Sequence, residues 1–141
     1  MTRAPAQTFS LLIGAVLAIA GVAGFLYNGD FGTGTHLPSD DLLGILSVNG
    51  WHNLVHLLTG LVGLRAARTW SGARTYCFAL FVLYTAIFVL GLAYGTNEAV
   101  LSLMPVNGGD DALHAIIAAT ALASGLATPA VPPPTLATEL G

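Results

Sequence analysis

The sequence has very little charge, with no lysine, four arginines and seven acidic residues in 141 positions. Charged residues make up 8% of the chain, whereas soluble domains carry about 25%. A chain with so few charges cannot cover a soluble surface, and the shortage of basic residues excludes nucleic-acid binding. We therefore expect an integral membrane protein whose first partner is the lipid bilayer.

Cysteine is also scarce, and this absence limits the chemistry that the chain can perform. The single cysteine, Cys77, lies in an apolar run, so an intramolecular disulfide and a CxxC redox centre are both excluded. The sequence shows no glycine-rich phosphate loop, no pair of carboxylates at membrane depth and no nucleophile arrangement around Cys77. An enzymatic activity is therefore not the expected function.

Long apolar runs dominate the chain instead. At about 1.5 Å of rise per residue, some 20 residues cross the roughly 30 Å hydrocarbon core of a bilayer. We predict an all-α integral membrane protein with one domain, residues 1–128, followed by a proline-rich disordered tail, residues 129–141. The four predicted transmembrane helices cover residues 9–27, 48–66, 75–94 and 110–128.

The first apolar run has a competing interpretation as a cleaved signal peptide. Ala18-Ile19-Ala20 resembles a small-residue cleavage site. The run is longer than the core of a typical signal peptide, and it takes part in the repeat described below. We therefore expect residues 9–27 to be retained as a helix of the fold.

The arginines predict the orientation of the bundle. All four lie either before the first run or in the connection 65–74, whereas the regions 28–47 and 95–111 hold six of the seven acids and no basic residue. The positive-inside rule then places both termini and the 65–74 connection in the cytoplasm. On the outer side, residues 41–47 are expected to form a short helical turn.

An internal repeat relates the two halves of the chain. A shift of 58 positions aligns Val48-Asn49-Gly50 with Val106-Asn107-Gly108, and it places His56 on His114. Under a slightly different shift, the segment 24–27 resembles 91–94. We therefore predict two helical hairpins of the same direction, related by a pseudo-two-fold axis along the membrane normal.

A stripe of polar residues marks the outer ends of the second and fourth helices. Helical spacing brings the side chains of each helix to one face, with glycine or alanine continuing that face below. If the two stripes meet at the bundle axis, their members form one polar cluster. The cluster would contain Asn49, His52, Asn53 and His56 from the second helix, and Asn107, Asp110, Asp111 and His114 from the fourth.

These residues also carry a family resemblance. The pattern Asn-x-x-His-x-x-x-Gly in the second run, and Pro105-Val106-Asn107 followed by Asp110-Asp111 and His114 in the fourth, resembles the bacterial membrane family DUF4383 over residues 9–126. The resemblance implies four transmembrane helices in the bacterial inner membrane, and it brings no established activity. Members of the family often have Asp-Asn where this chain has Asp110-Asp111.

Three interpretations of the polar cluster stay open. His56 and His114 could ligate a haem iron axially or contribute to a metal site. Alternatively, His52 and His56 could chelate a metal ion from one helix, completed by Asp110 or Asp111. The third interpretation is structural: Asn49 and Asn107 cap their helices, and the acids favour a helix N-terminus. Taken together, the candidate metal ligands are His52, His56, His114 and Asp111.

The expected function follows from how these interpretations are weighed. We expect first a small accessory or assembly protein, which associates with itself or a larger membrane complex through small-residue faces such as Gly14, Ala18, Gly21 and Gly24. The alternatives are a haem- or metal-binding protein that uses His56 and His114, and a protein that binds quinone or lipid with the polar cluster.

Overall fold

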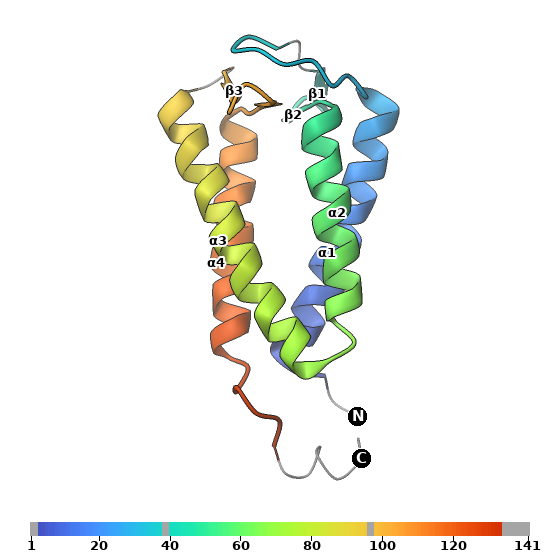
Figure 1. Cartoon of the computed structure of the whole chain (residues 1–141), viewed down its shortest axis with the longest axis vertical. Helices are drawn as coiled ribbons and strands as arrows, with labels where there is room; N and C mark the ends of the chain where they lie inside the picture. The colour runs from blue at the N-terminus through green and yellow to red at the C-terminus, as the bar shows by residue number, and fades with distance from the viewer. Residues whose placement is uncertain (1–2, 38–39, 96–97, 134–141) are drawn as a thin grey trace.

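The structure describes residues 3–37, 40–95 and 98–133, and four α-helices form most of this part of the chain. In this computed structural model they stand side by side, with the start of α1, the end of α4 and the α2–α3 connection at the same end of the bundle (Figure 1). The predicted all-helical fold is therefore confirmed, while most of the predicted tail, residues 134–141, lies outside the described residues. The helices are α1 Pro5–Tyr27, α2 Gly50–Ala66, α3 Trp70–Tyr94 and α4 Gly108–Leu126.

The helices pack as two hairpins, α1 with α2 and α3 with α4. Glycine allows the first pair to approach closely, because a Cβ atom on Gly21 would lie 2.6 Å from the backbone nitrogen of Leu57. A Cβ atom on Gly60 would likewise meet the backbone of Ala18. The small-residue face of α1 that we expected to meet another chain is thus occupied by α2 of the same chain.

Two short β-hairpins stand before α2 and α4. Strand β1 Asp40–Leu42 pairs with β2 Leu46–Val48, and β3 Ala99–Val100 pairs with β4 Met104–Pro105, both antiparallel. The expected helical turn at 41–47 is therefore wrong. A tight reversal forms instead, because left-handed residues with φ of 56° at Leu43 and 70° at Gly44 turn the chain back.

The two β-hairpins extend the internal repeat beyond the aligned Val-Asn-Gly triplets. The second hairpin turns through Leu101 and Ser102, with φ of 54° and 59°, which lie 58 positions after Leu43 and Gly44. The loop between α1 and α2 is nine residues longer than the loop between α3 and α4. This insertion explains why α1 matches α3 only under a shift of 67 positions, which superposes Gly24 on Gly91.

The long first loop crosses the end of the bundle opposite the α2–α3 connection (Figure 1). The backbone nitrogen of Gly34 donates to Ser102 O at 3.0 Å, and Ala99 donates to Thr35 O at 3.0 Å. At the start of α2, Gly50 donates to Asp30 O at 2.7 Å. The loop therefore connects the α1–α2 half of the protein with the α3–α4 half, next to the polar ends of α2 and α4.

Length and composition allow two of the helices to cross a membrane. These are α1, with 23 residues, and α3, with 25. Helix α2 has 17 residues, and α4 begins with Asp110 and Asp111 in its first turn. Helix α3 also begins earlier than predicted, since the Thr69 side chain caps it by accepting from Gly72 N at 3.2 Å. Arg74 consequently lies in a helix and not in a connection.

Candidate metal centre

Asparagine caps fix the starting points of α2 and α4. Asn49 Oδ1 accepts a hydrogen bond from His52 N at 3.0 Å. Asn107 Oδ1 accepts from the backbone nitrogens of Gly109, at 2.8 Å, and Asp110, at 3.0 Å. Both asparagines therefore play the capping role that the sequence indicated, and each satisfies backbone donors at the start of the helix that follows.

The caps also connect the two halves of the protein. Asn49 Nδ2 donates to Leu103 O in the second β-hairpin at 2.7 Å, and Asn107 Nδ2 donates to Ser47 Oγ in the first at 3.1 Å. The buried carboxylate of Asp110 accepts from Ser47 N and from Asn107 N, each at 3.0 Å. Asp110 is therefore committed to backbone hydrogen bonds and serves as a structural tie.

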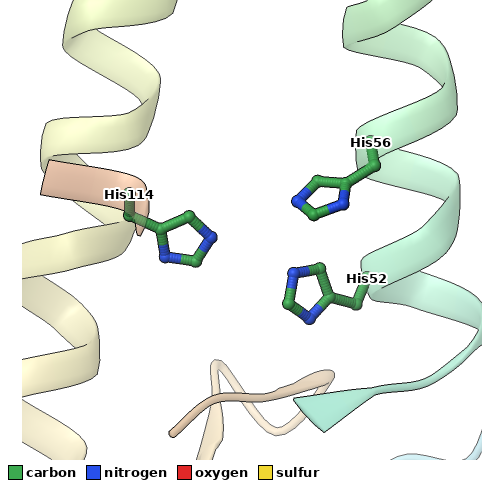
Figure 2. Close-up of side chains that lie close together, drawn as sticks. All are labelled: His52, His56 and His114. Carbon is green, nitrogen blue, oxygen red and sulfur yellow. The ribbon is translucent and has the colours of Figure 1, made fainter. Parts of the chain in front are cut away.

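Three histidine side chains converge between the hairpins, as Figure 2 shows. His52 and His56 come from successive turns of α2, and His114 reaches toward them from α4. The ring centroids of His52 and His56 lie 4.5 Å apart, and that of His114 lies 5.9 Å from His52 and 6.5 Å from His56. One ring nitrogen of each histidine lies within 4.8 Å of the other two. The structure thus joins the two histidine pairs that the sequence left as alternatives.

Four of the six imidazole nitrogens in this group are buried without a hydrogen-bond partner among the described residues. Both nitrogens of His52, Nε2 of His56 and Nδ1 of His114 are buried without one. The backbone of Ser47 and Pro105 comes near the His52 ring, but with no hydrogen bond of normal geometry. A buried polar atom without a partner costs about 1–3 kcal/mol, so the arrangement calls for an explanation. A neutral imidazole nitrogen is a metal ligand, and three of them within 4.8 Å of one another form a candidate donor set.

The walls of the site are mostly apolar. Besides the three histidines, they consist of Val55, Tyr84, Ile87, Met104 and Val106. The Tyr84 ring lies 5.4 Å from that of His114 and 6.4 Å from that of His56, and its hydroxyl is 3.5 Å from Thr59 Oγ1. The space between these side chains does not admit a water molecule.

The size of the site favours an ion over a large cofactor. Nitrogens bound to one ion at about 2.0–2.1 Å lie about 3.4 Å apart, so a metal ion would draw the rings inward by roughly an ångström. Rotations about the histidine side-chain bonds cover such a distance. A porphyrin, in contrast, needs a slot between His56 and His114 that the packing of Tyr84 and Ile87 does not provide.

Asp111 and Asn53 lie apart from the histidines. Asn53 Nδ2 donates to Asn28 O at 2.8 Å, and its side-chain oxygen lies against Gly24 of α1. The Asp111 carboxylate occupies the equivalent place against Gly91 of α3, and its Oδ1 is buried without a partner among the described residues. The structure therefore does not bring Asp111, a predicted metal ligand, into the histidine group.

Met104 and Tyr84 line the site although sequence reasoning did not select them. Tyr84 lies in the middle of an aromatic apolar run, where nothing distinguishes it from its neighbours. Met104 had a signal, because methionine occurs in this chain only at positions 1 and 104. Its place two residues before the second Val-Asn-Gly triplet could have attracted attention.

Comparison with known proteins identifies one family. Residues 7–127 match the family described as "Domain of unknown function (DUF4383)". The resemblance seen in the polar motifs is therefore confirmed over most of the chain. Neither a curated protein nor a solved structure matches this chain.

Proposed function

The chain belongs to the DUF4383 family, and from the site that it holds we propose that it is a multi-pass membrane protein that binds a transition-metal ion. The observation that carries this proposal is the group of His52, His56 and His114, whose buried ring nitrogens have no other partner among the described residues. Ionisable side chains within membrane helices are functional candidates because their burial is costly.

The outer surface of the bundle supports the membrane part of the proposal. Both α1 and α3 are long and apolar enough to cross a bilayer, and α2 and α4 pack alongside them over comparable depth. Large apolar side chains turned outward would be unusual on a soluble monomer but suit contact with lipid. Those of α1 are between 52% and 87% exposed: Leu12, Val16, Ile19, Val22 and Leu26.

The positions of the charges support the proposed orientation, with four spans and both termini in the cytoplasm of a bacterial cell. Arg65, Arg68 and Arg74 surround the α2–α3 connection, at the end of the bundle where α1 begins and α4 ends (Figure 1). Acidic residues occupy the opposite end, next to the histidine site. The positive-inside rule then places the metal site in the outer half of the membrane.

Metal binding takes precedence over the other functions expected from the sequence. Association through the small-residue face of α1 loses its main support, because Gly14 and Gly21 pack against α2. Haem binding by His56 and His114 would need space for a porphyrin, and the packing of Tyr84 described above does not leave that space. Quinone or lipid binding would use the cluster as hydrogen-bond donors, but Asn49, Asn107 and Asp110 already bond to the chain itself.

Metal analysis of purified protein tests the proposal. The protein is extracted in mild detergent, stripped with a chelator, loaded separately with Zn²⁺, Co²⁺ or Cu⁺, and desalted before mass spectrometry of the metal. We expect one ion per chain, and loss of most of that ion in H52A, H56A and H114A. His36 lies in the first loop outside the site, so H36A is the matched control and keeps the metal.

Two results would overturn the proposal. The first is a stripped protein that retains none of the three ions at one equivalent. The second is binding that survives in the three site variants as well as in H36A, since the ligands would then lie elsewhere. An absorption spectrum of the same sample before stripping tests haem, whose Soret band would disappear in H56A and H114A if the axial-ligand hypothesis were correct.

A further inference from the structure

The walls of the histidine site include one further residue that carries a donor atom. Met104 lies in β4 and is one of the residues that line the same space as His52, His56 and His114. Apart from Met1 it is the sole methionine of the given sequence. A thioether is a weak hydrogen-bond acceptor but a good ligand for soft metal ions. The site therefore combines three imidazoles with one sulfur.

The internal repeat shows that the third imidazole and the thioether each lack a counterpart in the other half of the chain. The shift of 58 positions places Met104 on Leu46 and His52 on Asp110. At two other positions of the site the halves agree, because the same shift aligns His56 with His114 and Val48 with Val106. The two halves thus differ at the positions that supply the third imidazole and the thioether. These differences change a symmetric pair of histidines into a single site with four donors.

The charge of the donor set limits the ions that it can hold. Imidazole and thioether are neutral, and no carboxylate belongs to the histidine group among the described residues. The bound ion therefore keeps its full charge inside an apolar bundle. The cost of burying an ion rises with the square of its charge, so a divalent ion costs about four times as much as a monovalent one. A monovalent soft ion satisfies both the charge and the donor types.

We infer that the ion is copper in its monovalent state, held by His52, His56, His114 and the Met104 thioether. This inference rests on the proposed metal site and adds to it the identity of the ion and of its fourth ligand. Soft thioether ligands select Cu(I), while imidazoles also accept Zn²⁺. Met104 is thus the residue that discriminates between the two ions.

Competition with a chromogenic Cu(I) chelator under anaerobic conditions tests this assignment. The purified full-length protein in detergent is compared with M104L, which keeps the size and apolar character of the side chain but removes sulfur. We expect M104L to bind Cu(I) about 10–100-fold more weakly, while its affinity for Zn²⁺ changes less than about twofold. The control C77S removes the other internal sulfur, which is buried away from the site in α3, and keeps the Cu(I) affinity.

X-ray absorption of the Cu(I)-loaded protein gives an independent measurement. We expect one sulfur neighbour of copper in the native protein and in C77S, and none in M104L. Equal Cu(I) affinity of M104L and the native protein, or a copper atom with nitrogen neighbours alone, would refute the role of Met104 and leave the three-histidine site intact. A protein that binds Zn²⁺ but not Cu(I) would refute copper, whereas failure to bind any ion would refute the proposed function itself.

Discussion

His52 and Asp110 occupy equivalent positions of the two halves, 58 residues apart, and their side chains have different tasks. Both lie in the first turn of a helix capped by asparagine, and both are 2% exposed. The Asp110 carboxylate accepts from Ser47 N and Asn107 N at 3.0 Å, so it fixes the first β-hairpin to α4. His52 instead faces His56 and His114. The repeat therefore builds two similar capped helices, and positions at which its halves differ, such as His52, form the histidine site.

A second pair of equivalent residues predicts an increase in stability. Asp111 has a buried carboxylate oxygen without a partner among the described residues, where its counterpart Asn53 donates to Asn28 O. We expect D111N to be stabilised by about 1 kcal/mol, because it removes a poorly solvated charge. The reverse change, N53D, should lose about 1–3 kcal/mol, since it removes the amide donor and places a carboxylate beside the Asn28 carbonyl.

Thermal unfolding in detergent measures both changes, with the reaction of Cys77 with a thiol-specific dye as the readout. Cys77 is fully buried and is the sole cysteine, so it reacts only as the bundle opens. An unfolding temperature that falls in D111N as it does in N53D would show that the Asp111 charge has a stabilising partner. The double variant N53D/D111N reports whether the two positions act independently.

Close helix packing predicts a loss of stability at Gly21. A Cβ atom there would lie 2.6 Å from Leu57 N and 2.8 Å from Asn53 O, both backbone atoms that cannot turn aside. We expect G21A to lose about 1–3 kcal/mol as α1 moves away from α2. Gly108 has open space around it, and G108A is the matched control, which should be neutral or slightly stabilising. Equal unfolding temperatures of G21A and the native protein would contradict this packing.

The sequence could predict the helices because their composition alone determines them. Four apolar runs, and a repeated Val-Asn-Gly triplet before two of them, are local features that need no knowledge of packing. The β-hairpins escaped prediction because their turns use left-handed Leu43, Leu101 and Ser102, residues that rarely adopt φ near +55°. Contacts with the long first loop and with the Asn49 cap hold the second of these turns in place, and such contacts cannot be seen along the sequence.

The candidate site was predictable in part. Helical periodicity places His52 and His56 on one face of α2, and the repeat pairs His56 with His114. Which of the neighbouring acids would join them depends on the rotation of α4, and one residue along a helix turns a side chain by about 100°. That rotation directs Asp110 to the β-hairpin and Asp111 to Gly91. Sequence reasoning could not distinguish these two directions from one toward the histidines.

The cap of α2 predicts a link between stability and metal affinity. Asn49 Oδ1 holds the backbone of His52, and its Nδ2 holds Leu103 of the opposite hairpin. We expect N49A to lose about 1–3 kcal/mol, from the cap and the cross-connection together, and to bind metal more weakly because the first turn of α2 frays. T69A removes the cap of α3 at the other end of the bundle. It should lose stability by a similar mechanism and keep the metal affinity, so equal weakening in both variants would contradict the link.

The proposed orientation predicts the side of the membrane from which each loop can be labelled. Single cysteines are placed at Gly32, Ser71 and Glu98 in a C77S background, and intact cells are treated with a membrane-impermeant maleimide. Gly32 follows α1 and Glu98 follows α3, whereas Ser71 lies in the first turn of α3, close in sequence to three arginines. We expect G32C and E98C to react in intact cells, and S71C to react only after the membrane is permeabilised, because the arginine-rich side faces the cytoplasm.

Labelling of S71C alone in intact cells would show that the orientation is the inverse of the proposed one. Labelling of G32C without E98C would mean that α3 does not cross the membrane. The inverted orientation would also move the metal site to the cytoplasmic half of the membrane, since His52 and His114 lie near the starts of α2 and α4.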